Sequence, residues 1–350
     1  MNKNFFKIDR RISLLDILKI LNISKNDFYL ENRNLEDPLE KIFIEDLVSF
    51  QKLNKNNLSF CNNIKSSYKE ITSGICIVSK QNVKFLNKNI IKIPFEQPKK
   101  GFEKILKNYF SPHQKLNKET LIHPSAIIHS TVKLGKNVFI GAFSIIDEGV
   151  VIEDNVYISE RVSISFNCKI GRDSFIGSGV FIECTTIDKK VSIYHNTVLG
   201  KIGFGFIPKK TKTSIMPHIG GLEIGEGTCV GSGCTIDRGL IENTKIGKYV
   251  MIDNQVHIGH NCLIDDFCIL AGQVGLSGSV VLKKNVFIGG DVSIRDNVTI
   301  GHNSIIAGAS KVFNDFPDGS KIGGSPAQDI NSWKRLVASQ RLFLKKRKKN

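Results

Sequence analysis

Branched aliphatic residues recur at every sixth position through much of this chain. One series runs without exception from Ile246 to Val312, and another runs from Ile122 to Ile182. A shifted frame continues the second series from Ile187 to Leu199. Strands alternate every two residues and helices turn every 3.6, so a period of six indicates short strands separated by a turn at a fixed interval.

The other positions of each hexad suit corners between such strands. The second is often Gly, Asp or Ala and the fourth is often Asn, Asp or Gly, residues that tolerate tight turns and positive φ. The fifth is small or β-branched, as in Val138, Ser144 and Val256. Three hexads would close one triangular coil, and successive coils would stack about 4.8 Å apart. The pattern predicts a mainly β fold, a parallel β-helix with an aliphatic interior.

The first hundred residues lack the sixfold period. They combine an amphipathic helical start near Leu14–Leu21 with short strands such as Gly74–Val78. Residues 1–100 are therefore predicted to form a separate small α/β domain, and residues 101–117 a helical connector.

The repeat is predicted to fill residues 118–313, with two interruptions. Gly203–Gly221 is polar and rich in Lys and Thr, which indicates a loop extruded from the coil. A four-residue excess separates Leu240 from Ile246. Loops that leave a rigid scaffold commonly carry function.

Residues 314–350 are predicted to form a basic, helical C-terminal extension. One apolar face is expected from the spacing of Ile330, Trp333, Leu336 and Val337. The formal net charge of the chain is +16, and basic residues without acidic ones concentrate from Ile330 to the C-terminus. A solvated charge run is the alternative to a binding surface.

The eight cysteines are predicted to be reduced core residues of a cytoplasmic protein. No CxxC pair exists, and Cys168, Cys234, Cys262 and Cys268 fall on the small fifth position of their hexads. The apolar stretch at Leu14–Leu21 contains Asp16 and Lys19, so it is not typical of a signal peptide. Nothing approaches the roughly 20 apolar residues that span a bilayer.

Histidine offers the candidate chemistry. Gly-His-Asn occurs at His260 and again at His302, seven hexads apart, which predicts different edges of the prism. Gly278 occupies the hexad position of His260 one coil further on. A neutral imidazole can act as general base, and a glycine N–H can donate to an oxyanion. This pair would suit acyl transfer; corner histidines without a role are the alternative.

Four ordered segments carry a specific resemblance: Gly203–Phe206, Thr235–Gly239, Ile252–Asn261 and Ala271–Gly275. They resemble the UDP-3-O-(3-hydroxyacyl)glucosamine N-acyltransferase family of lipid A biosynthesis. The resemblance implies a left-handed β-helix and a homotrimer with active sites in grooves between subunits. It also implies transfer of an (R)-3-hydroxyacyl group from acyl carrier protein to the 2-amine of a UDP-3-O-acylglucosamine, without metal or cofactor.

The same resemblance implies roles for individual residues. His260 matches the general base, Gly278 the oxyanion donor, and Asp253 and Asn254 the neighbouring carboxylate and amide. Asp253 could orient His260, although a corner carboxylate turned to solvent is the alternative. His257 is expected to contact substrate in the groove.

One position departs from the family pattern. A second family histidine, two coils beyond the base, would fall at Asn297. Asparagine can still hydrogen-bond a substrate but cannot titrate near neutrality, so any proton-transfer role of that position is in doubt.

The N-terminal domain contains a segment, Leu58–Lys65, that resembles the family's uridine-binding segment. Phe60 could stack on uracil, Asn63 could hydrogen-bond the uracil edge, and Lys65 could meet a phosphate. Tyr68 matches only with a small insertion.

Three other functions stay open from the sequence. The chain could be a hexapeptide-repeat acyltransferase for a different nucleotide sugar or for acetyl-coenzyme A, or a noncatalytic nucleotide-sugar-binding β-helix. The zinc-dependent carbonic anhydrase on this repeat is disfavoured because its His-x4-His pair is missing.

The basic C-terminal segment would suit the acidic acyl carrier protein or a membrane surface as its partner. No recognition motif in the sequence supports binding to nucleic acid.

Overall fold

The computed structural model describes residues 6–8, 11–32, 35, 37–62, 70–112, 122–207, 213–324, 335–336 and 338–340. The chain divides into two compact units, Met1–Asn117 and Lys118–Asn350.

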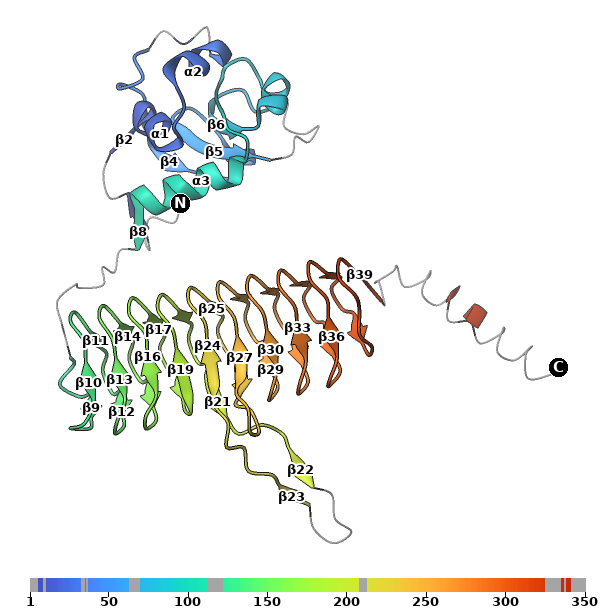
Figure 1. Cartoon of the computed structure of the whole chain (residues 1–350). Helices are drawn as coiled ribbons and strands as arrows, with labels where there is room; N and C mark the ends of the chain where they lie inside the picture. The colour runs from blue at the N-terminus through green and yellow to red at the C-terminus, as the bar shows by residue number, and fades with distance from the viewer. Residues whose placement is uncertain are drawn as a thin grey trace. The chain divides into compact units, whose positions relative to one another are not determined.

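The first unit contains a parallel sheet with helices (Figure 1). The sheet order is β4-β5-β6-β7, from β4 (Asp46–Leu47), β5 (Asn57–Cys61), β6 (Gly74–Val78) and β7 (Ile90–Pro94). The helices are α1 (Leu14–Leu21), α2 (Lys25–Glu31), α3 (Pro98–Tyr109) and the 3-10 helices η1 (Phe50–Lys52) and η3 (Lys80–Phe85). Two short antiparallel pairs join β1 (Phe6–Ile8) to β8 (Phe110–Pro112) and β2 (Ile12–Ser13) to β3 (Phe43–Ile44).

Local sequence explains the first helix. The Ser13 hydroxyl accepts a hydrogen bond from the Asp16 N–H, and the Asp16 carboxylate accepts one from the Ser13 N–H, which is a capping box. The helix ends at Asn22, whose φ of 55° is left-handed. Ile105 and Tyr109 of α3 are buried in the same core as α1, so this helix belongs to the first unit rather than to a separate connector.

The second unit consists of three parallel sheets wound around one core (Figure 1). Sheet I contains β9 (Ile127–Ile128), β12 (Ile145–Ile146), β15 (Ser163–Ile164), β18 (Phe181–Ile182), β21 (Val198–Lys201), β26 (Thr235–Asp237), β29 (His257–Ile258), β32 (Gly275–Leu276), β35 (Ser293–Ile294) and β38 (Lys311–Val312). Sheet II contains β10 (Lys133–Leu134), β13 (Val151–Ile152), β16 (Lys169–Ile170), β19 (Thr185–Ile187), β24 (Leu222–Ile224), β27 (Thr244–Ile246), β30 (Leu263–Ile264), β33 (Val281–Leu282) and β36 (Thr299–Ile300). Sheet III contains β11 (Phe139–Ile140), β14 (Tyr157–Ile158), β17 (Phe175–Ile176), β20 (Ser192–Ile193), β25 (Cys229–Val230), β28 (Met251–Ile252), β31 (Ile269–Leu270), β34 (Phe287–Ile288), β37 (Ile305–Ile306) and β39 (Lys321–Ile322).

The pairing register follows the repeat. In most coils a residue pairs with the one 18 positions later, as His257 does with Gly275. In the coil that ends at Leu199 the separation is 17, as between Ile182 and Leu199. In the two-residue strands of the coil the second residue points inward, and Ile258, Ile264 and Leu270 are almost completely buried. Corners use left-handed residues, for example Asn261 with a φ of 59°. The predicted left-handed parallel β-helix is confirmed.

The regular coil has several exceptions. In the first coil the inward positions Ile122 and Leu134 are exposed, because no described coil precedes them. The segment predicted to be extruded contains an antiparallel hairpin of β22 (Phe206–Ile207) and β23 (Ser214–Ile215), which projects from the coil in Figure 1.

Of the predicted C-terminal helical face, only Leu336 is among the described residues, and it is exposed. Within the described ranges, no helix has the length and hydropathy to cross a membrane.

All eight cysteines are free thiols. Burial raises the pKa of Cys168 to about 11 and the pKa of Cys262 to about 12. Cys168, Cys234, Cys262 and Cys268 lie in the β-helix core as small fillers, as the sequence predicted.

Candidate active site

A cavity of about 720 Å³ opens along the edge where the chain passes from sheet I to sheet II. Of the residues predicted from the sequence, His257, His260, Gly278 and Asn297 line it. His260, Gly278 and Asn297 follow strands β29, β32 and β35, which are consecutive neighbours in sheet I. The stacking of coils therefore brings together residues that are far apart in the sequence.

His260 and Gly278 lie in direct contact. A methyl group on Gly278 would come within 2.7 Å of both Cε1 and Nε2 of His260. No side chain larger than hydrogen therefore fits at position 278 without displacing the imidazole. Within the described part of the chain, the Gly278 N–H donates to no protein acceptor, whereas its carbonyl accepts from Asn297 N–H at 3.1 Å. A donor held in place and left unpaired is the arrangement that an oxyanion requires.

Asn261 determines which nitrogen of His260 is free. Its Oδ1 lies 3.0 Å from His260 Nδ1 and also accepts a hydrogen bond from the Leu240 N–H at 2.9 Å. Since an amide oxygen only accepts, Nδ1 of a neutral His260 carries the proton and Nε2 keeps its lone pair. The side that faces Gly278 is thus the basic side of the ring. The sequence interpretation missed this role of Asn261, although the Gly-His-Asn tripeptide was its signal.

Asn261 is itself fixed by the segment that interrupts the repeat. Its N–H donates to Thr244 Oγ1 at 2.8 Å, and its Nδ2 donates to the Glu242 carbonyl at 3.1 Å. The four-residue excess between Leu240 and Ile246 therefore wraps around the asparagine that holds His260.

Asp253 and Asn254 lie elsewhere on the prism. They follow β28 of sheet III, at the preceding corner, and do not line the cavity. The Asp253 carboxylate accepts from the Asn254 N–H and side-chain amide, and Asn254 Oδ1 accepts from the Ser232 N–H. Within one chain, strand β29 of sheet I separates the Asp253 corner from the His260 corner, and Asn261 makes the contact with His260 Nδ1. That Asp253 orients His260 stays a prediction.

His257 and Asn297 are exposed at the cavity wall. His257 Nδ1 lies 2.8 Å from Thr235 Oγ1 on the neighbouring strand. Asn297 Nδ2 donates to Asp296 Oδ2 at 2.9 Å. Both side chains are available to a ligand without disturbing the coil.

Among the further residues that line this cavity are three that the sequence interpretation did not single out as site residues. Asp237, at the end of β26, is buried and forms an ion pair with Lys201 Nζ from β21. Phe204 and Phe206 lie 5.1 Å apart, ring centroid to centroid, and Phe204 is 82% exposed. A buried carboxylate, paired with a partly exposed lysine, and an exposed aromatic pair thus line one cavity. The Gly-Phe-Gly-Phe motif signals the aromatic pair, but no sequence pattern indicates that Asp237 is buried.

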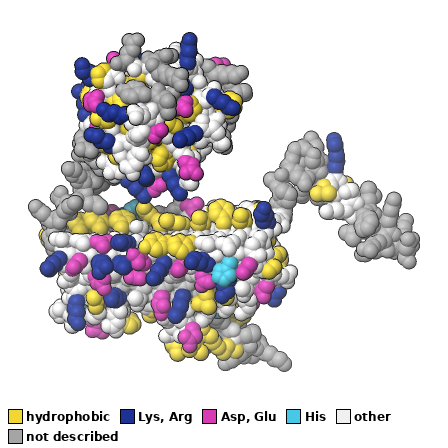
Figure 2. Space-filling view, turned by 45° about the horizontal axis from the view of Figure 1, so that its top comes forward, with side chains coloured by type: hydrophobic (Ala, Val, Ile, Leu, Met, Phe, Trp, Pro, Cys, Tyr) yellow, Lys and Arg dark blue, Asp and Glu magenta, His cyan; other side chains and the backbone are white. Residues whose placement is uncertain are grey.

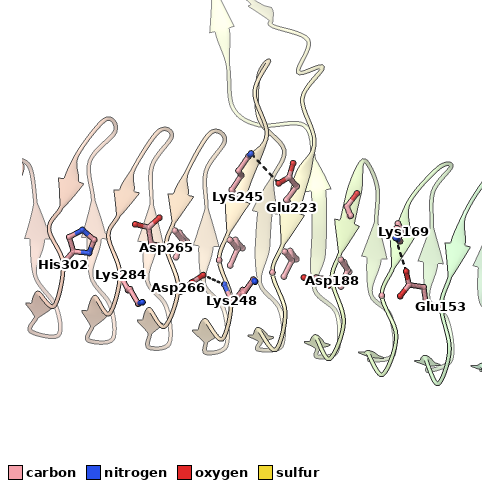
Figure 3. Close-up of a pocket in the computed structure, with 18 residues that line it drawn as sticks. Glu153, Lys169, Asp188, Glu223, Lys245, Lys248, Asp265, Asp266, Lys284 and His302 are labelled. Carbon is pink, nitrogen blue, oxygen red and sulfur yellow. Dashed lines mark hydrogen bonds and ion pairs between the residues drawn. The ribbon is translucent and has the colours of Figure 1, made fainter.

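The second Gly-His-Asn tripeptide lies on another groove, as predicted. His302 follows β36 of sheet II and lines a cavity of about 650 Å³ (Figure 3). Ion pairs run along it, with Lys169 3.0 Å from Glu153 and Lys245 3.6 Å from Glu223. This groove carries charges of both signs, whereas the cavity at His260 combines a base with an unpaired backbone donor.

The N-terminal unit has a cavity of its own, about 810 Å³ in volume. Phe60 lines it beside Phe102, and their ring centroids are 4.9 Å apart. Lys99 and Lys100 at the start of α3 line it as well. Asn63, Lys65 and Tyr68 lie outside the described residues. Among the described residues, no group of three or more His, Cys, Asp or Glu side chains could hold a metal ion.

Comparison with known proteins agrees with the repeat. The family described as the hexapeptide repeat of succinyl-transferase matches residues 131–159. The second unit is a hexapeptide-repeat β-helix. A UDP-3-O-acylglucosamine N-acyltransferase of Leptospira biflexa is 44% identical over 101 residues, which are 29% of this chain and 29% of that protein. The resemblance predicted from the sequence motifs is confirmed over this aligned region, and the match spans less than a third of the relative's length.

Two solved structures extend the comparison. The UDP-N-acetylglucosamine O-acyltransferase of Moraxella catarrhalis is 28% identical, with 55% of this chain and 67% of that chain covered and a TM-score of 0.44. An Arabidopsis UDP-N-acetylglucosamine acyltransferase is 24% identical, with 61% and 76% covered and a TM-score of 0.49.

Proposed function

We propose that this chain is an N-acyltransferase that moves an (R)-3-hydroxyacyl group from acyl carrier protein to the 2-amine of a UDP-3-O-acylglucosamine. The proposal rests on one observation above all. His260 presents its unprotonated Nε2 to Gly278, whose N–H has no protein acceptor among the described residues. The named relative in Leptospira supports the choice of substrate.

The reaction then needs only these groups. The 2-amine attacks the thioester carbonyl while His260 Nε2 removes its proton, and the Gly278 N–H stabilises the oxyanion that forms. When the tetrahedral intermediate collapses, the C–S bond breaks and the imidazolium returns the proton to the leaving thiolate. Asn261 accepts from Nδ1–H throughout and so stabilises the imidazolium.

Each unit by itself contains residues assigned to substrate binding. Phe60 and the cavity beside α3 would hold the uridine, with Lys99 and Lys100 near its phosphates. His257 and Asn297 would contact the sugar near the reacting amine. Phe204 and Phe206 would cover the apolar acyl chain at the mouth of the cavity.

A trimer would supply what one chain lacks. Sheet III presents an outward column of apolar side chains, including Met251, Ile269, Phe287 and Ile305, each 42–48% exposed. Figure 2 shows such hydrophobic side chains in rows along the coils. Extended exposed apolar surfaces mark interaction sites. We assign this column to contacts between copies, which would also bring the Asp253 corner of one copy toward the His260 edge of another.

The decisive experiment replaces each histidine of the two Gly-His-Asn tripeptides. His260→Ala should lower kcat by about 10² to 10⁴, the usual contribution of a general base, and His302→Ala should change it less than twofold. Turnover is measured by mass spectrometry of the acylated UDP-sugar, with 3-hydroxyacyl carrier protein as donor. If the His260 variant keeps full activity while the His302 variant loses it, the assignment is wrong.

Donor choice separates this reaction from a related one. Acyl carrier protein thioesters should support turnover and acetyl-coenzyme A should not. Faster transfer from acetyl-coenzyme A would favour an acetyltransferase, and UDP-sugar binding without any turnover would favour a noncatalytic binding protein.

A further inference from the structure

A second histidine, His218, packs against His260 from the extruded segment. Its side chain is buried, and the two rings lie 5.2 Å apart between centroids at an interplanar angle of 70°. His218 lies between β23 and β24, so the extruded segment returns to the coil at the candidate base.

One hydrogen bond of His218 indicates which ring nitrogen carries a proton. Nδ1 lies 2.9 Å from the Met216 carbonyl, which can only accept, so Nδ1 carries a proton. Nε2 is buried and has no hydrogen-bond partner among the described residues. The backbone at Gly203 lies next to this nitrogen, so Nε2 is enclosed where the extruded segment leaves the coil.

Two glycines make this packing possible. A methyl group on Gly203 would come within 2.8 Å of both His218 Nε2 and His260 Cβ, and one on Gly205 within 2.9 Å of His218 Cε1. The backbone at the start of the extruded segment therefore lies flat against the His218 ring, and Gly203 also touches His260. Any side chain at position 203 would have to displace one of the two rings.

The position of His218 is anchored from the coil side as well. Arg238 Nε donates to the His218 carbonyl at 3.0 Å, and Arg238 Nη1 is 3.2 Å from Glu183. Arg238 follows β26 directly, and both it and Glu183 belong to the rigid coil. His218 is thus part of the β-helix wall rather than of the projecting hairpin.

We propose that His218 is a positioning residue for His260. It packs against one side of the His260 imidazole and so restricts the ring to one orientation. In that orientation Nδ1 contacts Asn261 and Nε2 faces Gly278. This role deepens the proposed acyl transfer and rests on it.

The test uses two variants of the full-length chain. His218→Asn keeps an amide nitrogen where Nδ1 bonds to Met216 but removes the part of the ring that reaches His260, and His218→Ala removes both. With 3-hydroxyacyl carrier protein and UDP-3-O-acylglucosamine, both variants should lower kcat about tenfold or more and leave KM within about threefold. His302→Ala, at the other groove, serves as the matched control and should change neither constant.

A spectroscopic readout separates positioning from folding. With ¹⁵N-labelled histidine, the ring nitrogens of His260 should report a single Nδ1–H tautomer in the wild-type chain and a mixture in both variants. Thermal unfolding followed by circular dichroism should give the Asn variant a midpoint close to that of the wild type.

Three results would overturn the proposal. One is a kcat within twofold of wild type in both variants, and another is a rise in KM with kcat unchanged, which would indicate substrate contact. The third is a loss of kcat that accompanies loss of folded structure with the His260 tautomer unaltered. If the wild-type chain transfers no acyl group, the proposed function fails, and if His260→Ala retains turnover, the assignment of His260 as the base fails. In both cases the tautomer measurement still decides whether His218 positions the ring.

Discussion

At the residue scale, Asn261 links the candidate base to the backbone around it. Its Oδ1 is shared between His260 Nδ1 and the Leu240 N–H, and its own N–H and Nδ2 are bound by the 242–244 segment. Because its Oδ1, Nδ2 and backbone N–H are all engaged, the Asn261 side chain cannot turn without breaking several hydrogen bonds. It therefore holds the His260 tautomer more firmly than a single surface contact would.

We expect Asn261→Ala to lower kcat by roughly one to two orders of magnitude, since His260 loses the acceptor that fixes its tautomer. Asn261→Asp keeps an acceptor oxygen and should retain most activity. Steady-state acyl transfer measures both.

The control for backbone strain is Asn303→Ala. Asn303 is the equivalent residue of the second tripeptide, with a φ of 56° against 59° for Asn261. Each alanine should cost about 1 kcal/mol of stability for its left-handed conformation. If the Asn303 variant lost as much activity as the Asn261 variant, strain rather than tautomer control would explain the effect.

Single residues were only partly predictable. The contact of His260 with Gly278 follows from their separation of 18 residues, which is one coil. The role of Asn261 depends on where the 240–244 segment folds, and that of His218 on how the extruded segment returns. The hexad pattern predicts the path of neither segment, because the repeat is interrupted in both.

At the element scale, strands of two residues are stable here because each pairs on both sides and buries one side chain. On β30, Ile264 is 2% exposed inside the core, while Leu263 is 41% exposed on the outer face. Two neighbouring aliphatic residues on one strand therefore differ almost only in burial.

This pair gives a stability prediction. Ile264→Ala should destabilise the fold by about 2–5 kcal/mol through lost burial and a cavity, and Leu263→Ala by less than about 1 kcal/mol. Urea unfolding followed by circular dichroism would measure the difference. Equal losses for the two variants would contradict the assignment of inner and outer faces.

The elements of the coil were the most predictable part of the molecule. The position of Ile258 and its sixfold equivalents defines both the strand and the inward face, so the sequence pattern suffices. The start of α3 was not predictable in the same way: the helix begins at Pro98 and its buried residues join the first unit. Gly101 lies inside this helix, whereas the sequence interpretation placed the boundary between the first domain and the connector there.

At the scale of the whole molecule, sheet III carries the surface most in need of a partner. Its exposed column includes Ile269 and Phe287, and the stacked rings of Phe139 and Tyr157 continue it at the other end, 4.3 Å apart between centroids. The hexad repeat gives all three sheets the same periodicity. It therefore does not predict which sheet forms the contact between copies, because that depends on the shape of each outer surface.

We expect Phe287→Glu combined with Ile269→Glu to shift the protein from trimer to monomer, because two charges would then lie in the contact between copies. Light scattering coupled to size-exclusion chromatography would report the mass. Leu263→Glu, equally exposed but on sheet II, is the matched control and should leave the mass unchanged. A monomeric wild-type protein, or disruption by the control alone, would show that sheet III is not the interface.

The contact between His260 and Gly278 has a consequence for how the length of this protein can change. The two residues lie one coil apart in a β-helix built from equivalent coils. An insertion between them would therefore place them on different sheets or separate them by more than one coil. Beyond Gly278, by contrast, a whole coil could be added or removed without changing the contact between the two residues. The geometry of the pair therefore does not depend on the number of coils, and the length of the groove can vary with the size of the ligand that it binds.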